Sequence, residues 1–274
     1  MALTAFIEGI GLLGPGLSGW PEGVAVLRGT QGYVARATEL PPADGLPAAE
    51  RRRASPVVRL ALAVGREAIA ASGREAASLS TVFSASAADG RNYHAICEQL
   101  ASGDPLISPT RFHNAVHNAP AGYWGIATGA MAPSNVMCAH DASFGAGLLD
   151  SLGQVVVDGL PCVLISYDTE YEPPLRALRP VPHAFGVALV LAPQPGPQSL
   201  ARISVEPITA DPQTGTPHAT RLSDPTLQAL REVTPSARAL PLLQALACVA
   251  PQDIVLDYLD DLLLRVSVTP CRPS

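Results

Sequence analysis

The chain contains no lysine: all 18 of its cationic side chains are arginine, against 24 acidic ones, and its formal net charge is −6. Without lysine there is no phosphate-binding P-loop lysine and no Schiff-base chemistry. No long basic block offsets the acidic balance, which argues against nucleic acid as a partner.

Long hydrophobic runs are also missing. No stretch reaches the roughly 18 consecutive apolar residues that a membrane span needs. The first residues lack a basic segment and soon meet Glu8, so we expect no signal peptide. The five cysteines are odd in number, scattered and without a Cys-x-x-Cys pair, which favours reduced thiols over disulfides or a zinc site. We therefore expect a cytoplasmic protein without a membrane span.

What the chain does contain is a regular alternation of strand-like and helix-like segments up to about residue 192. This pattern predicts an α/β fold with a mostly parallel sheet covered by helices. The predicted strands cover residues 5–11, 81–87, 134–139, 162–166, 186–191, 201–206 and 262–268. The predicted helices cover residues 20–28, 54–71, 91–101, 119–128, 142–158, 225–232 and 236–249.

The first strand runs into the glycines Gly9, Gly11 and Gly14, which literally match the dinucleotide fingerprint G-x-G-x-x-G. That fingerprint requires a helix to begin within the glycine run, so that its N-terminus meets the pyrophosphate. Here Pro15 and Gly16 break the chain instead. A loop that ends a strand is the better interpretation.

Residues 113–149 read as a helix, a short buried strand, a sharp elbow and a second helix. A strand that enters a helix through a tight elbow is where many α/β folds display a nucleophile. Here the elbow carries His140 and Asp141.

Two chemical alternatives follow from this stretch. A hydrolase using Ser143 with His140 or His183 lacks the G-x-S-x-G motif. A metal site from His113, His117 and Asp141 lacks the Glu of H-E-x-x-H. The simpler interpretation is that these histidines form hydrogen bonds in an interface or a vestigial pocket.

Three motifs together carry a family resemblance: residues 7–16, residues 59–69, and Asn118–Gly122 followed by Gly129–Pro133. They resemble the opening strand and glycine loop, the "LALxAxxEA" helix and the "NxxAG…GxxGP" block of the β-ketoacyl synthases, which have the thiolase fold. The resemblance covers roughly residues 3–210, the N-terminal half of such an enzyme. It implies a thiolase-like domain, a mixed sheet covered by helices, without the C-terminal thiolase half.

A gap-free count from Asn118 places the family's acylated cysteine at Asp141. Cys138 lies before the elbow and Ser143 after it, so neither stands at that position. We expect Asp141 to cap the following helix. By resemblance, the two catalytic histidines belong to the family's C-terminal half, and the nearest echo, residues 212–217, has proline where a histidine would stand.

The missing cysteine and the missing catalytic histidines are both typical of chain-length-factor subunits, such as those of aryl-polyene and type II polyketide systems. The resemblance therefore implies a non-catalytic subunit that pairs with an active β-ketoacyl synthase and shapes its acyl tunnel in fatty acid or polyketide biosynthesis. The segment before Asn118 would reach the partner's tunnel, and the helix after the elbow would lie at the interface. The tunnel and interface residues expected on this basis are Arg111, Phe112, Ala115, His117, Asn118 and Phe144.

We expect residues 1–210 to form the ketosynthase-like domain and residues 211–274 an extension that completes or caps it. Acyl carrier protein would dock mainly through the partner, with Arg51–Arg53 either in a solvated loop or facing an acidic partner. No cofactor and no metal are expected. The alternatives are a stand-alone acyltransferase or hydrolase using Ser143 or Cys138, and a homodimeric binding protein that uses the old acyl pocket.

Overall fold

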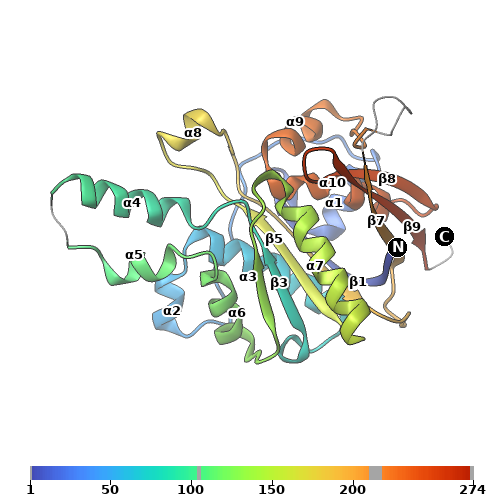
Figure 1. The fold of residues 1–274 in the computed structure, drawn as a ribbon, viewed down its shortest axis with the longest axis horizontal. Coiled ribbons are helices and arrows are strands. Elements are labelled where there is room, and N and C mark those ends of the chain that lie inside the picture. The colour runs from blue at the N-terminus through green and yellow to red at the C-terminus, as the bar shows by residue number, and fades with distance from the viewer. Residues whose placement is uncertain (1, 104–105, 210–217, 272–274) are drawn as a thin grey trace.

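A twelve-residue strand, β1 (Leu3–Gly14), lies near the middle of the molecule and organises the sheet around it (Figure 1). The computed structural model describes residues 2–103, 106–209 and 218–271. Within this part of the chain, nine strands form one sheet in the order β4-β3-β5-β6-β1-β7-β9-β8, and the short β2 (Leu17–Ser18) pairs with β1. The other strands are β3 (Ser80–Ser84), β4 (Ser134–Met137), β5 (Cys162–Asp168), β6 (Phe185–Ala192), β7 (Ala201–Thr209), β8 (Gln252–Asp257) and β9 (Leu262–Pro270).

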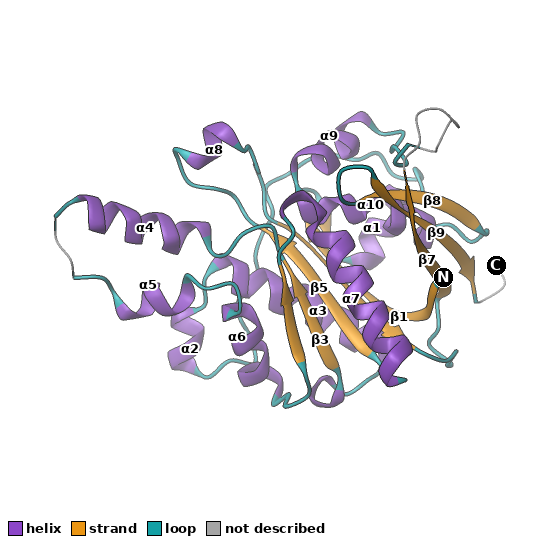
Figure 2. Ribbon diagram, in the orientation of Figure 1, coloured by secondary structure: helices purple, strands orange, loops and turns teal. Residues whose placement is uncertain are grey.

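Helices cover both faces of this sheet (Figure 2). None of the described helices is both long enough and apolar enough to cross a membrane. The helices are α1 (Trp20–Leu27), α2 (Ala48–Arg53), α3 (Pro56–Ser72), α4 (Gly90–Ala101), α5 (Pro109–Asn114), α6 (Ala119–Thr128), α7 (Ser143–Asp158), α8 (Leu175–Leu178), α9 (Pro225–Val233) and α10 (Leu240–Ala247).

The sheet is mixed and covered by helices, as expected, but the expectation that it is mostly parallel is wrong. Only β3–β4 and β3–β5 pair in parallel among the described strands. The ladders of β6 with β5 and with β1 are antiparallel. The segment between β5 and β6 holds only the four-residue α8, so the chain turns back instead of crossing over a sheet face on a long helix.

Alternating side chains of β5 fill two separate cores. Cys162 and Leu164 belong to the core beneath α7 and α10, whereas Val163 and Ile165 belong to the core beneath α3 and α6. A strand that is covered on both faces needs apolar residues at every position. The continuous apolar run of β5 is therefore the correct signal for a buried central strand.

Gly9 and Gly11 lie where α3 crosses β1 at close range. A Cβ atom at Gly11 would collide with the carbonyl oxygen of Val64, and one at Gly9 with the carbonyl oxygen of Ala68. Both glycines are therefore required by helix-to-strand packing. This replaces the dinucleotide interpretation of the same residues, because no helix begins within the glycine run.

The described C-terminal residues, 218–271, continue the same sheet. β9 pairs with β7 along nine positions and with β8 on its other side. α10 packs against α1 from the opposite end of the chain. The sequence pattern did not predict β8. Its apolar run is only three residues long, Ile254 to Leu256, and polar residues flank it on both sides. Residues 212–217, which were compared with the family's histidine motif, lie outside the described residues.

Two local expectations need correction. Arg51–Arg53 form the last turn of α2 and not a loop, although their side chains are exposed. β4 was expected to be buried, but its first two residues are exposed and its last two only half-buried, because it is the edge strand beside β3. By contrast, α3 ends at Gly73 with a positive φ of 67°, as its sequence predicted.

Replacing Gly11 with alanine should destabilise the chain by about 2 kcal/mol or more, because the new methyl group forces α3 away from β1. Urea unfolding measures this loss. Gly153→Ala in α7 is the matched control, since a Cβ there meets nothing within 4 Å. It should leave stability unchanged or raise it by up to about 1 kcal/mol. Equal stabilities for the two variants would contradict the proposed packing.

Candidate functional site

The elbow between β4 and α7 is a one-turn 3-10 helix, His140–Ala142, at the carboxyl end of the parallel strands. His140 has a φ of 50°, a left-handed conformation that non-glycine residues seldom adopt. The imidazole therefore stands at the sharpest point of the turn, and the Asp141 carboxylate follows one residue later. The elbow predicted from the sequence is present.

Ser143 holds this turn together and is 1% exposed. Its hydroxyl accepts a hydrogen bond from the Ala139 amide at 3.0 Å and donates one to the His140 carbonyl at 2.7 Å. Both of its partners are backbone groups, so neither histidine of the hydrolase interpretation activates it. Ser143 therefore braces the backbone of the elbow.

Asp141 does not cap α7, contrary to expectation. The N-cap position is Ala142 and receives no side-chain hydrogen bond. The Asp141 carboxylate instead forms ion pairs with two arginines: one oxygen meets Arg179, and the other lies 3.3 Å from Arg238. Two guanidinium groups outcompete backbone amides for a carboxylate because charge-assisted pairs are the stronger ones.

Cys138 lies at the end of the strand that enters the elbow, and its side chain is exposed. Its thiol contacts the Ser86 carbonyl oxygen at 3.5 Å. No basic group or helix N-terminus is among the hydrogen-bond partners given to this thiol in the described residues.

A polar cleft of about 370 Å³ opens beside the elbow. Its walls come from the elbow, from Arg238 and from the turn between β8 and β9. Three aspartates and one arginine line it, so acidic groups outnumber basic ones. The lining residues are Ala139, His140, Asp141, Ala142, Arg238, Asp257, Tyr258, Leu259, Asp260 and Leu263.

A second acidic group, Asp168, lies buried behind the elbow at the end of β5 and is 4% exposed. One carboxylate oxygen accepts hydrogen bonds from the amide and hydroxyl of Ser86, and the other from the Ser236 amide at 2.7 Å. The Ser86 hydroxyl also lies 2.9 Å from the Tyr171 hydroxyl. Burial raises the pKa of Asp168, and the hydrogen bonds from Ser86 and Ser236 oppose that rise.

Asp168 was not predicted as a functional residue. The signal in the sequence was an acidic residue at the end of a mostly apolar strand. A carboxylate in such a place must be hydrogen-bonded, because burying it without partners costs free energy. Its partner Ser236 is nearly 70 residues away in sequence, so no local pattern reveals the pair.

The histidines near the elbow do not converge on one point. The ring of His113 packs edge-on against Tyr123 at 6.5 Å. The Nδ1 atom of His117 is buried without a hydrogen-bond partner, and burial lowers the pKa of this side chain while Asp168 opposes the shift. No cluster of three or more potential metal ligands occurs among the described residues, so the metal interpretation built on His113, His117 and Asp141 is not supported.

The residues expected to form a tunnel or interface fall into two groups. Arg111, Phe112, Ala115, His117 and Asn118 lie together on α5 and on the turn into α6, where Phe112 is 66% exposed. Phe144 is instead fully buried in the chain's own core and is not available to a partner.

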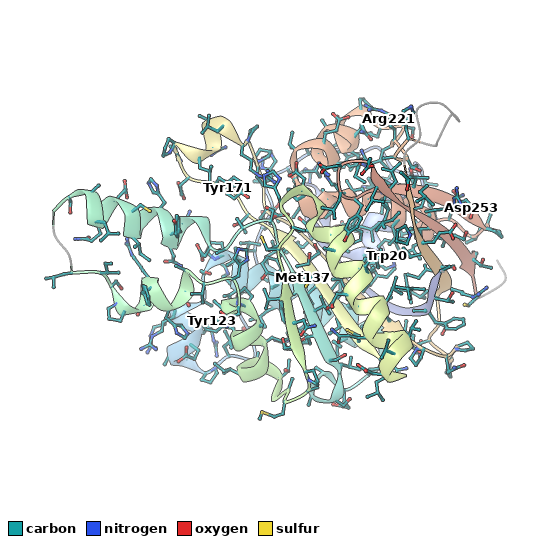
Figure 3. The ribbon with its side chains drawn as sticks, viewed as in Figure 1. Trp20, Tyr123, Met137, Tyr171, Arg221 and Asp253 are labelled. Carbon is teal, nitrogen blue, oxygen red and sulfur yellow. The ribbon has the colours of Figure 1, made fainter. Side chains whose placement is uncertain are left out.

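A short hydrogen-bond chain holds α5 in place. The Tyr123 hydroxyl donates to the Asn114 side-chain oxygen at 3.0 Å, and the Asn114 amide donates to the Arg53 carbonyl at 3.0 Å. Figure 3 shows Tyr123 on the side of the molecule that carries α5 and α6, with Met137 near the centre and Tyr171 towards α8.

The family model of the β-ketoacyl synthase N-terminal domain matches residues 28–245 of the chain. A search of curated proteins found no match. Among solved structures, a chain of the ketosynthase ApeO in complex with its chain length factor ApeC from Xenorhabdus doucetiae has a TM-score of 0.73 at 21% identity, covering 97% of this chain and 99% of that chain.

Two further solved complexes are similar in fold. A chain of the ishigamide ketosynthase/chain length factor has a TM-score of 0.74 at 14% identity and covers 97% of this chain and 99% of that one. A chain of AntDE:AntF, a type II polyketide synthase acyl-carrier protein in complex with its ketosynthase, has a TM-score of 0.74 at 11% identity and covers 98% and 100%. At these identities the likeness concerns the fold.

The raised pKa of Asp168 predicts the sign of one pH dependence. The folded chain holds this proton to a higher pH than the unfolded chain does. The contribution of Asp168 to the free energy of unfolding is therefore fully present below the pKa that this group has in the unfolded chain. It is lost as the pH rises through the pKa of the folded chain. Asp168→Asn lacks this proton, so the stability of the wild type minus that of the variant should fall with rising pH. Urea unfolding of both proteins between about pH 4 and pH 8 measures it, and a difference that rises would contradict the assignment.

Proposed function

Because the chain belongs to the β-ketoacyl synthase family through its N-terminal domain, we propose that it is a non-catalytic subunit that pairs with an active ketosynthase. The ketosynthase-like, thiolase-type fold expected from the sequence is confirmed by the family match and by the solved relatives. In the proposed role, the subunit completes a dimer and shapes the partner's acyl tunnel in fatty acid or polyketide biosynthesis, as a chain length factor does.

The elbow is the observation that carries this proposal. A ketosynthase requires a thiolate at a helix N-terminus. At the position where the gap-free count places that thiolate, the chain has Asp141, and its carboxylate is neutralised by Arg179 and Arg238. A carboxylate side chain has no sulfur and cannot hold an acyl group as a thioester, and the Ser143 hydroxyl beside it is hydrogen-bonded to backbone groups.

The open edge of β4 supports a partner. Among the described strands β4 pairs only with β3, so its other side carries unpaired backbone groups. Exposed sheet edges are templates for pairing with another chain. Large apolar side chains are exposed in the segments before and after β4: Phe112, Val116, Ile126, Met131, Val156, Val157 and Leu160.

The hydrogen bonds of β4 identify which backbone groups face outward. The carbonyls of Pro133 and Met137 accept bonds from Thr81 and Ala85, on the β3 side. Backbone groups alternate in direction along a strand, so Asn135 also faces β3, whereas Ser134 and Val136 face the open edge. A partner strand would bond to these two residues.

The segment that would reach the partner's tunnel stands on an arm formed by α4 and α5, which projects from the body in Figure 1. No residue within the described helix α4 is buried in the chain itself. Phe112 and Ala115 lie on this arm and on the turn after it, next to Arg111, His117 and Asn118. An exposed phenyl ring at the end of an apolar slot would limit the length of the acyl chain.

Acyl carrier protein would be the source of the substrate. One of the similar solved structures contains an acyl-carrier protein with its ketosynthase. In this chain the exposed arginines of α2, Arg51–Arg53, lie beside α5 and offer positive charge to an acidic carrier. The remaining docking surface would come from the partner.

A stand-alone acyltransferase or hydrolase is the alternative, and the exposed thiol of Cys138 is the feature that favours it. Stable labelling of the isolated chain by a thioester or fluorophosphonate probe, lost in Cys138→Ala or Ser143→Ala, would establish that alternative and exclude the non-catalytic role.

Co-expression with a ketosynthase encoded beside this chain should give a stable complex on size-exclusion chromatography. Val136→Pro should weaken the complex by about tenfold or more, because proline removes an outward amide and places its ring at the edge. Titration of the purified subunits measures the change.

Val136→Ala is the matched control, since it shortens the same side chain but keeps the amide, and it should bind nearly as tightly as the wild type. Equal affinities for the proline and alanine variants would remove β4 from the interface. A chain that stays alone beside every neighbouring ketosynthase would exclude the subunit role.

Within such a complex, Phe112→Ala should lengthen the acyl products by at least one extension step, because it enlarges the end of the slot. Ala115→Phe should shorten them by filling the same space. Mass spectrometry of carrier-bound products measures both shifts. An unchanged product distribution in both variants would place the arm outside the tunnel.

A further inference from the structure

The segment between β5 and β6, residues 169–184, stands away from the body and carries α8 at its tip (Figure 1). The apolar side chains at its tip are not part of the hydrophobic core: Leu178 is 85% exposed and Leu175 is also exposed. Tyr171 and Val181 are buried at the base of the loop, so the exposed part is the tip around α8. A tip with few buried contacts opens easily unless specific side chains hold it.

Three polar side chains of this loop fasten it to other described segments. Near its start, the Tyr171 hydroxyl lies 2.9 Å from the Ser86 hydroxyl. At the next residue, Glu172 pairs with Arg91 of α4 at 3.3 Å. Near its end, Arg179 binds Asp141 and also contacts the His140 ring.

The third attachment has the strongest electrostatic basis. Arg179 is four-fifths buried, and so is Arg238, which approaches the other oxygen of the same carboxylate. Asp141 is thus the counter-charge that allows two guanidinium groups to lie close together. Removing its charge would leave Arg179 facing another cation without compensation, which favours release of the loop.

We propose that Asp141 is a positioning residue that latches the loop 169–184 over the elbow. The position that would carry a nucleophile in the family holds an anchor in this chain. Because the same loop contacts α4 through Glu172 and Arg91, the latch also orients the arm that carries Phe112. This last consequence rests on the proposed function, whereas the latch itself does not.

Hydrogen exchange of the isolated wild-type chain, followed by mass spectrometry, tests the latch. In Asp141→Asn, amides of residues 169–184 should exchange about three- to fivefold faster, the size expected for one partly exposed ion pair. Arg179→Gln should have the same effect, and the double variant should add nothing, because both changes break one interaction. Asp141→Glu, which keeps the charge, should retain most of the protection.

Glu206→Gln is the matched control. It neutralises a carboxylate whose exposure is similar to that of Asp141 and which pairs with Arg265 at 2.9 Å on the far part of the sheet. It should leave the exchange of residues 169–184 unchanged. Unchanged exchange of the loop in Asp141→Asn would overturn the proposal, and so would an equal acceleration throughout the chain, which would make Asp141 a contributor to global stability only.

A measurement on the complex separates this proposal from the proposed function. If the complex with the ketosynthase forms, Asp141→Asn should broaden the product distribution while leaving the subunit affinity within about twofold. If no complex forms but the loop is released in the isolated variants, the proposed function fails and the latch stands.

Discussion

The close approach of α3 to β1 is the constraint on which the rest of the structure depends. Gly9 and Gly11 have no side chains, so the backbone of α3 rests directly on the central strand at Val64 and Ala68. From this position α3 also covers β5 and β6. Any larger residue at either glycine would lift the helix and open the core on that face. β5, whose carboxyl end carries Asp168, is one of the strands that α3 covers.

Electrostatics then decide what the elbow does. The turn has the sharp backbone of a nucleophile display, with a positive φ at His140, but the charges around it satisfy one another. Arg179 and Arg238 come from segments far apart in sequence and meet at one carboxylate. The elbow therefore joins segments that are distant in sequence through one carboxylate. The edge strand β4 leaves backbone groups available for a partner nearby.

Local pattern was sufficient where the chain's own periodicity sets the structure. The bounds of α6 follow from its sequence, and α3 ends at a glycine with the required left-handed φ. The elbow, too, was visible as a short strand followed by a helix with small residues. Strand direction was not predictable in the same way, because β1, β6 and β7 pair antiparallel across long sequence separations. The prediction of a mostly parallel sheet was wrong because it assumed that a long helix connects each pair of neighbouring strands. The connection between β5 and β6 contains only the short α8, and these strands are antiparallel.

The sequence by itself determined the family and the order of most elements, because these are properties of residue identity and spacing. Tertiary structure alone decided that Asp141 pairs with two arginines and does not cap α7, that Asp168 lies buried against Ser86 and Ser236, and that β4 is an open edge. The physical reason is the same in each case. The free energy of a charge or a strand edge depends on which groups surround it in space, and those groups come from distant parts of the chain.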